Sequence, residues 1–317
     1  MPSENEPLIS QLDSINEYFA SCVRVIIHAS EMLTKGSGKN DFMHSEAVHQ
    51  RLSELLPEAQ QFGLNEAEIF VLIASAYLHD IKHSNTESGQ RHGEASAKMI
   101  NDDSSLRYIF PSGDIQNQVA KICYYHDREI KELENLEETI KLDFRPCYSF
   151  KISNMVVRPR MMGALFRLAD ELECNSDRML AQSANENDPR TIIAGVRIDL
   201  ESRFIYLDFK YGATKEKWDR CVEHIHTKFE TLNNFLNTYG LSFKIANELP
   251  ESEFIDEKER VDTQKGALEY EEEGSKHYVK PQKAANFDIL MKVYQQKRMN
   301  RIDSVTSIFP ERGIKND

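Results

Sequence analysis

Cysteine is scarce in this 317-residue sequence, and its distribution excludes two kinds of structure. The five cysteines are odd in number, lie far apart and never form a CxxC pair: Cys22, Cys123, Cys147, Cys174 and Cys221. A disulfide framework requires an even set of cysteines, and thiolate zinc sites require closely spaced ones. Neither kind of structure is therefore predicted.

Long apolar runs and a basic N-terminus are also missing. The first residues, MPSENEPLISQLDS, are acidic and polar, whereas a signal peptide is basic and then apolar. No apolar run approaches the roughly 20 residues that span a bilayer. We therefore expect a cytoplasmic protein without membrane contact.

Positive charge is the third deficit. Lys and Arg number 39 against 52 Asp and Glu, which gives a net charge of -13. Such a surface does not attract polyanions broadly, so long nucleic acid is not an expected partner. A small phosphate-bearing molecule needs only a few converging donors. The length of 317 residues is enough to bury a large core and predicts one large domain with an appendage rather than two equal domains.

The most informative stretch is residues 70–83, FVLIASAYLHDIKH, an apolar run that ends in His79 and Asp80. A helix that is apolar nearly all round is buried, and a buried carboxylate is costly without a partner. A metal ion would remove that cost. A His-Asp pair that satisfies itself by hydrogen bonding is the simpler interpretation.

Four further helical patterns each place one ligand-type residue on or beside an apolar stripe: His44, His92, His126 and Asp170. Helices that converge on one point are the usual way in which a bundle builds a metal site. His49, five positions after His44, points away from it on a helix and is expected at the rim or in solvent.

The rest of the chain predicts a mainly α protein with a small α+β appendage. Residues 8–34 read as one helix, and the acidic residues 129–143 as a solvated helix or a lid. Alternating apolar residues from about 191 to 209 predict a β-hairpin, followed by a helix over roughly 215–238 and a strand at 241–245.

Three parts follow from these patterns. Residues 1–182 are expected to form a helical domain, and residues 183–248 a subdomain of β-hairpin plus helix. Residues 249–317 begin with an acidic linker and end in an amphipathic helix. That helix would dock on its own domain or make a dimer or partner contact.

The order His44, His79-Asp80, His92, His126, Asp170 resembles the HD superfamily of metal-dependent phosphohydrolases over residues 40–180. The phrases AYLHDI and FRLADELE, with the hairpin and helix that follow, are most similar to bacterial HD domains found alone or beside Hsp90-like ATPase modules. The resemblance implies an HD-type helical bundle and a partner ATPase, while the C-terminal helix indicates a homo-oligomer as the other candidate partner.

The resemblance also implies a ligand set. One metal would be held by His44, His79, Asp80 and Asp170, and a second by His92 and His126 with Asp80 as the bridge. Imidazole and carboxylate ligands suit a divalent transition metal, Mn, Fe, Ni, Co or Zn, with Mg as a further candidate, at one or two ions per chain.

The expected chemistry is attack by metal-activated water, with Asp80, His92 and His126 as the catalytic residues. With one metal, either of the two histidines would act instead as a general acid. Basic residues beside the motif are the substrate-binding candidates, with a surface or structural ion pair as the alternative role: Lys82, His83, Arg91, Arg128 and Arg167.

Three functions remain in view. The first is hydrolysis of a phosphoester or phosphoanhydride in a nucleotide-like small molecule, by a nucleotidase, cyclic-nucleotide phosphodiesterase or triphosphohydrolase. The second is a regulatory module that binds a nucleotide or a partner ATPase with little turnover. The third is a metal-dependent single-strand nuclease, which the charge of -13 disfavours.

Overall fold

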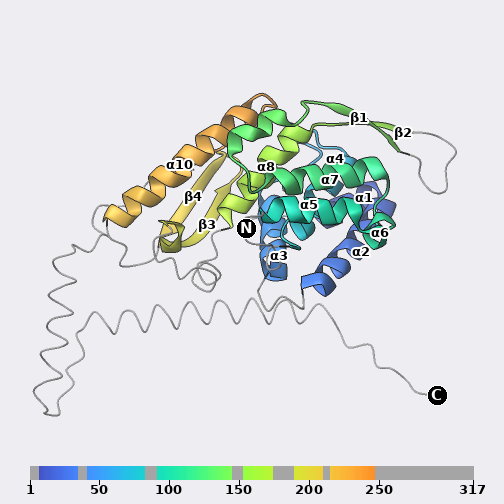
Figure 1. The fold of residues 1–317 in the computed structure, drawn as a ribbon. Helices are drawn as coiled ribbons and strands as arrows, with labels where there is room; N and C mark the ends of the chain where they lie inside the picture. The colour runs from blue at the N-terminus through green and yellow to red at the C-terminus, as the bar shows by residue number, and fades with distance from the viewer. Residues whose placement is uncertain are drawn as a thin grey trace, which may run out of the picture. The chain divides into compact units, whose positions relative to one another are not determined.

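The computed structural model describes residues 7–34, 41–82, 91–144, 153–173, 189–209 and 215–246. This part of the chain is mainly helical with two small sheets, as the sequence predicts (Figure 1). The predicted boundary at 182/183 and the predicted linker and terminal helix of 249–317 lie outside the described residues.

The helices, in chain order, are α1 (Leu8–Ile15), α2 (Glu17–Thr34), α3 (Asp41–Leu55), α4 (Glu66–Leu78), α5 (His92–Asp102), α6 (Ser104–Arg107), α7 (Gly113–Tyr125), α8 (Pro159–Leu172) and α10 (Lys215–Asn237), with short 3₁₀ turns η2 (Ile130–Asn135) and η3 (Pro189–Ile192). The strands are β1 (Ile140–Phe144), β2 (Ser153–Val157), β3 (Ile193–Asp199), β4 (Phe204–Phe209) and β5 (Lys244–Ala246). None of the described helices is long and apolar enough to cross a membrane.

Helix α4 forms the centre of the bundle, with α1, α2, α3, α7 and α8 packed around it. Every residue from Ala67 to Leu78 is buried, as its all-round apolar sequence predicts. The helix starts at Asn65, whose side chain accepts the N–H groups of Ala67 and Glu68. Glu68 in turn accepts the N–H of Asn65, which completes a capping box.

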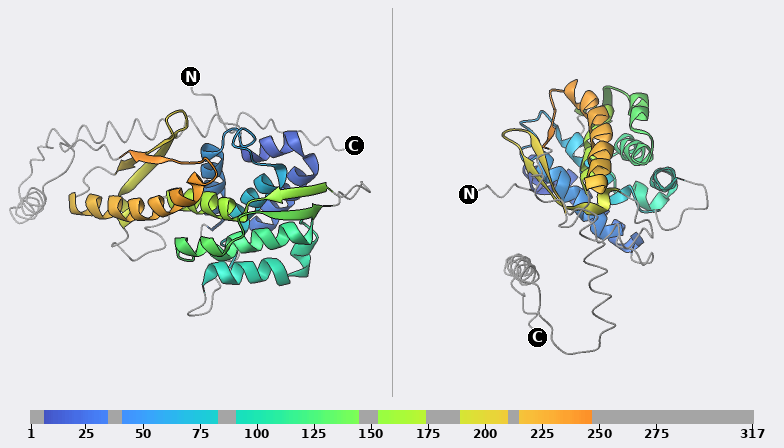
Figure 2. Two further views of the ribbon diagram at one scale, coloured as in Figure 1. Left: turned by 90° about the horizontal axis from the view of Figure 1, so that it is seen from above. Right: turned by 90° about the vertical axis from the view of Figure 1, so that its left-hand side faces the viewer.

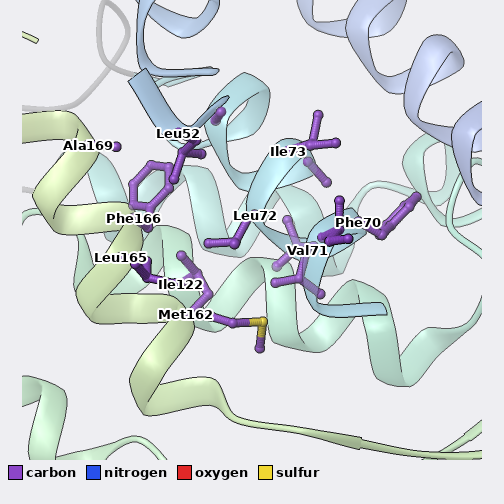
Figure 3. Close-up of a cluster of buried hydrophobic side chains, with 14 of the residues drawn as sticks. Leu52, Phe70, Val71, Leu72, Ile73, Ile122, Met162, Leu165, Phe166 and Ala169 are labelled. Atoms are coloured by element: carbon purple, nitrogen blue, oxygen red, sulfur yellow. The ribbon is translucent and has the colours of Figure 1, made fainter. Parts of the chain in front are cut away.

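The core between these helices is built from interlocking aliphatic and aromatic side chains (Figure 3). Helix α4 contributes Phe70, Val71, Leu72 and Ile73, and its neighbours contribute Leu52, Ile122, Met162, Leu165, Phe166 and Ala169. Burial of a single side chain of this size stabilises the fold by about 1.5–3 kcal/mol. The core therefore fixes the positions of α3, α4, α7 and α8 relative to one another.

An ion-pair brace joins the start of α4 to the start of α8. Glu68 is fully buried, and it accepts hydrogen bonds from Arg158 Nε at 2.8 Å and Nη2 at 2.7 Å. The backbone N–H of Arg158 adds a third bond at 3.0 Å. The two helices therefore begin together, and since they have 13 and 14 residues, at 1.5 Å per residue their far ends lie about 20 Å away.

The prediction of one helix over residues 8–34 is wrong, because the chain breaks at Asn16. Asn16 has an extended backbone, with φ -151° and ψ 89°. Its side chain accepts the N–H of Phe19 and so starts α2 as a new helix. The break lets both α1 and α2 pack on α4.

The prediction of a solvated helix or lid over residues 129–143 is also wrong. The segment forms η2 and then strand β1, which pairs with β2 in an antiparallel ribbon, Leu142 opposite Met155. Ile140 and Leu142 alternate with polar residues, and this period of two is typical of a strand.

The predicted hairpin, helix and third strand are confirmed. Strands β3 and β4 are antiparallel, with Val196 opposite Leu207, and β5 runs parallel to β4. Helix α10 lies alongside this sheet in both views of Figure 2. Cys221 on this helix packs with Ile192 and Ile193. The appendage shares the main core through Phe229, Leu232 and other residues.

Candidate metal centre

The six predicted ligand residues converge from five helices. His44 lies on α3, His79 and Asp80 follow α4, His92 begins α5, His126 follows α7, and Asp170 lies on α8. The end of α4 is thus the meeting point: α3, α7 and α8 pack on α4 and bring His44, His126 and Asp170, and α5 packs on α7 and brings His92.

The first group of ligand atoms surrounds one oxygen of Asp80. The Nε2 atoms of His44 and His79 are 3.1 Å apart, and Asp80 Oδ2 lies 3.8 and 3.5 Å from them. Asp170 Oδ1 lies 3.2 Å from His44 Nε2 and 3.9 Å from His79 Nε2. Two imidazoles and two carboxylates therefore face one point.

The second group surrounds the other oxygen of Asp80. The Nε2 atoms of His92 and His126 are 3.0 Å apart, and Asp80 Oδ1 lies 3.4 and 3.3 Å from them. The carboxylate of Asp80 is thus divided between the two groups, as a bridging ligand would be.

The helix ends fix which ring nitrogen faces the cluster. His79 Nδ1 lies 3.0 Å from the carbonyl oxygen of Ala76, and His126 Nδ1 lies 2.6 Å from that of Cys123. Each of these carbonyls belongs to the last turn of a helix, where carbonyls lack a partner within the helix. A neutral ring that donates from Nδ1 directs the lone pair of Nε2 into the cluster.

These distances fit a divalent ion in each group. Two imidazole lone pairs at 3.0–3.1 Å repel one another unless a proton or a cation lies between them. Ligands bonded to one metal at about 2.0–2.2 Å lie roughly 3 Å apart. The groups His44, His79, Asp80 and Asp80, His92, His126 can therefore each hold a divalent metal ion.

The electrostatic surroundings keep Asp80, Asp170 and His79 in the protonation states in which these side chains bind metal. Burial would raise the pKa of Asp80, but the neighbouring histidines, His79 above all, hold it well below its usual range. The pKa of Asp170 is lowered against burial by the hydrogen bond with His44 and by the other histidines. Burial lowers the pKa of His79 to about 3, so this ring stays neutral.

His126 differs from His79 in its protonation. Burial, the largest single effect, opposes its charged form, but the hydrogen bond with Asp80 and the charges of Asp80 and Asp170 together outweigh burial and raise the pKa of His126. Metal binding in the second group therefore competes with protonation of His126 more than metal binding in the first group competes with protonation of His79.

Exposure also differs among the ligands. The side chain of His79 is fully buried and that of His44 is 4% exposed, whereas His92 is 32% exposed and Asp170 is 20% exposed. Water and small molecules therefore reach the cluster from the side of His92 and Asp170.

The sequence of this region matches a known family. Residues 38–181, which contain the whole cluster, match the family model HD-CE. Residues 38–181 form an HD-type domain. A search of curated proteins finds no match to the chain. An HD-type domain with a His/Asp cluster that can hold metal is the arrangement of a metal-dependent hydrolase.

The arginines predicted to bind substrate all contact the HD-type domain itself. Arg91 Nη1 donates to the carbonyl of Asp127 at 3.1 Å, and Arg167 Nη1 donates to that of Arg128 at 3.3 Å. Arg128 pairs with Glu94 at 3.0 Å and lies over the ring of Tyr124.

Lys82 contacts Ser96 through its backbone N–H, and His83 lies outside the described residues. A role for these five basic residues in substrate binding stays a prediction.

Two carboxylates near the ligands were missed in the sequence. Glu173 Oε2 lies 2.9 Å from His44 Nδ1, and Asp127 Oδ2 lies 3.6 Å from His92 Nδ1. Glu173 is three residues after Asp170, on the same side of the end of α8, and Asp127 directly follows His126. These spacings are the only signals in the sequence that could have indicated them.

The expectation that His49 lies at the rim or in solvent is wrong. His49 is buried, and its Nδ1 lies 3.1 Å from the hydroxyl of Tyr77 on α4. The side of α3 that points away from His44 is covered, because α3 packs on α4 and Arg51 reaches the carbonyl of Val196 in β3. Burial lowers the pKa of His49 to about 4.

Proposed function

We propose that the chain hydrolyses a phosphoester or phosphoanhydride bond in a nucleotide-like small molecule, with one or two divalent transition-metal ions. The observation that carries this proposal is the division of Asp80 between two ligand groups, His44 with His79 and His92 with His126. Two cations that share a carboxylate suit the charge on a phosphoryl group.

The ligand residues have separate roles in this proposal. Asp80 and Asp170 stay ionised and supply negative charge, His79 supplies a neutral nitrogen, and His44 supplies a second imidazole nitrogen. Divalent ions bound here lower the pKa of water and neutralise charge on phosphoryl oxygens. His92, at the exposed edge, is the ligand residue nearest to an entering substrate.

His126 offers a proton when the second group holds no metal. Its Nε2 lies 3.3 Å from Asp80 Oδ1, and this neighbouring carboxylate raises the pKa of His126 against the effect of burial. It would then donate that proton to the leaving oxygen as a general acid. The number of ions bound therefore decides whether His126 acts as a ligand or as an acid.

Local cations, rather than overall charge, would hold the phosphates. Lys82, Arg91, Arg128 and Arg167 each lie within three residues of a ligand, whereas the whole chain carries -13. A few such donors suffice for two or three phosphate groups. A single-strand nuclease would need an extended basic track instead.

The contacts of these arginines favour a second candidate function. Arg128 and Arg167 already bind Glu94 and Glu171, and Arg91 binds a backbone carbonyl. A regulatory module that binds a nucleotide or a partner ATPase with little turnover would not need these arginines to be available to a reacting phosphate. The two candidates differ in turnover and share the metal site.

One screen separates them. Mono- and triphosphates, cyclic mononucleotides, cyclic oligonucleotides and single-stranded DNA are incubated with Mn, Co, Ni, Fe, Zn or Mg, and products are separated by chromatography. Asp80→Asn should reduce product to the level of the blank, whereas Asp114→Asn, an exposed aspartate in the first turn of α7, should not.

Two outcomes would contradict the enzyme. Turnover that survives Asp80→Asn would show that the cluster is not the catalytic centre. No turnover with any metal, together with a nucleotide that raises the melting temperature of wild type and Asp80→Asn alike, would favour the regulatory module.

A further inference from the structure

The turn after α7 carries a buried carboxylate that belongs to neither ligand group. Asp127 follows His126, and its side chain is 8% exposed. One oxygen, Oδ2, accepts the backbone N–H of Gly93 at 3.1 Å and lies 3.6 Å from His92 Nδ1. Asp127 thus contacts the first two residues of α5, one of which is a ligand.

Helix α5 depends on this carboxylate for its first turn. Arg91 occupies the N-cap position and makes no capping hydrogen bond through its side chain. The first N–H groups of a helix have no partner within the helix and favour a negative charge. Asp127 therefore fastens the start of α5, and with it His92, to the turn that carries His126.

Capping alone does not explain a charged residue here. The second oxygen of Asp127, Oδ1, is buried and has no hydrogen-bond partner among the described residues. A buried carboxylate oxygen without a partner is costly, whereas the amide of asparagine or a serine hydroxyl caps a helix at less cost. The negative charge of Asp127 is explained if it interacts with a positively charged or polarised side chain nearby.

The imidazole of His92 is that group. Its Nε2 faces the cluster, 3.4 Å from Asp80 Oδ1, while its Nδ1 faces Asp127. A carboxylate on the outer nitrogen favours a proton there, leaves the lone pair on the inner nitrogen and makes that nitrogen a better ligand. At 3.6 Å the contact is electrostatic rather than a hydrogen bond.

We propose that Asp127 is the positioning residue of the second metal site, because it orients the ring of His92 and fixes the tautomer in which Nε2 binds a divalent ion. Asp127 belongs to neither ligand group, and its Oδ2 lies on the Nδ1 side of the His92 ring, away from the nitrogen that faces the cluster. The proposal rests on the proposed function to the extent that both need metal at this cluster.

The test is a titration of the full-length, chelator-treated protein with Co²⁺ alone, followed by visible absorption and calorimetry. Asp127→Asn keeps an oxygen that can accept the N–H of Gly93 but removes the charge. The first equivalent should bind as in wild type, and the second about 10–100-fold more weakly. Asp127→Glu, which restores the charge, should recover part of this loss.

Asp114→Asn is the matched control, because it removes one negative charge from the exposed first turn of α7. It should leave both equivalents unchanged. The melting temperature of the chelator-treated protein should fall only slightly in Asp127→Asn, through the lost charge at the start of α5, whereas a purely structural role would lower it strongly.

Each remaining outcome overturns the proposal. Asp127→Asn that binds both equivalents like wild type would refute it and leave the proposed function standing. Wild type that binds one equivalent would show that no second site exists to be positioned. Wild type that binds none would overturn the proposed function as well.

Discussion

Gly93 is the position where the smallest substitution should have the largest effect on the metal centre. It is the second residue of α5, and a Cβ there would lie 2.6 Å from the carbonyl oxygen of Cys123 on α7. The same Cβ would lie 2.9 Å from both Asp127 Oδ1 and His126 Cε1. The nearest atom is backbone, so Gly93→Ala requires the two helices to separate.

The displacement can be set against the tolerance of a metal site. A carbon and a carbonyl oxygen in contact are normally about 3.3–3.6 Å apart, so the helices must separate by roughly 0.7 Å. Metal–ligand distances are held to about 0.2 Å. The Nε2 atoms of His92 on α5 and His126 after α7 would therefore no longer both reach one ion at bonding distance. We expect the second equivalent of Co²⁺ to bind at least about tenfold more weakly.

The effect on stability should be smaller than the effect on metal. Overpacking costs about 1–3 kcal/mol, and the higher helix propensity of alanine offsets up to about 1 kcal/mol of it. We expect Gly93→Ala to lose about 1–2 kcal/mol in urea unfolding of the chelator-treated protein.

Gly113→Ala is the matched control for this substitution. It lies in the first turn of α7 with nothing within 4 Å of the added carbon. We expect it to be neutral or slightly stabilising and to bind both equivalents of Co²⁺. If the Gly93→Ala and Gly113→Ala proteins have the same stability in urea and the same affinity for the second equivalent of Co²⁺, the separation of α5 from α7 does not occur and the prediction is refuted.

Three further predictions concern pH and the missed residues. Because the pKa of His126 is raised and that of His79 is about 3, acidification from pH 8 to 6 should weaken the second Co²⁺ equivalent more than the first; equal weakening would contradict this. The pKa of His49 is about 4 in the folded protein and about 6.5 in the unfolded chain. Below about pH 6.5 the unfolded chain therefore binds a proton that the folded protein does not, and the free energy of unfolding decreases as the pH is lowered. Between pH 7 and 5 wild type should lose about 2 kcal/mol more than His49→Gln in urea unfolding, and identical losses would refute this. Glu173→Gln should weaken the first Co²⁺ equivalent about 10–100-fold through His44 and spare the second, and the reverse pattern would show that Glu173 does not act on His44.

The sequence allowed the centre of the fold to be predicted because one signal is unambiguous. An apolar run that ends in His79 and Asp80 indicates a buried helix with a carboxylate at its end that needs a partner. The structure places that end at the cluster. His126 and Asp170 were found in the same way, as polar residues that continue an apolar stripe.

Residues that act through tertiary contacts could not be predicted in this way. Asp127 and Glu173 stand in polar surroundings in the sequence, and their partners His92 and His44 are 35 and 129 residues away. His49 has no apolar neighbour pattern that would reveal Tyr77 across the interface. Their positions depend on how helices pack, which local spacing does not encode.

Strand β1 was missed for a different reason. Its alternation is present in the sequence, but the acidic residues before it make the whole stretch look solvated. Asn16 was likewise read as part of a long helix, although asparagine often starts a new one.

The unequal exposure of the two ligand groups affects how any metal analysis of this protein should be understood. In the first group His44 and His79 are almost fully buried and Asp170 is 20% exposed, so an ion held there would exchange more slowly than an ion beside His92, which is 32% exposed. Metal retained through purification would then report mainly on the first group, and metal added to an assay would report mainly on the second.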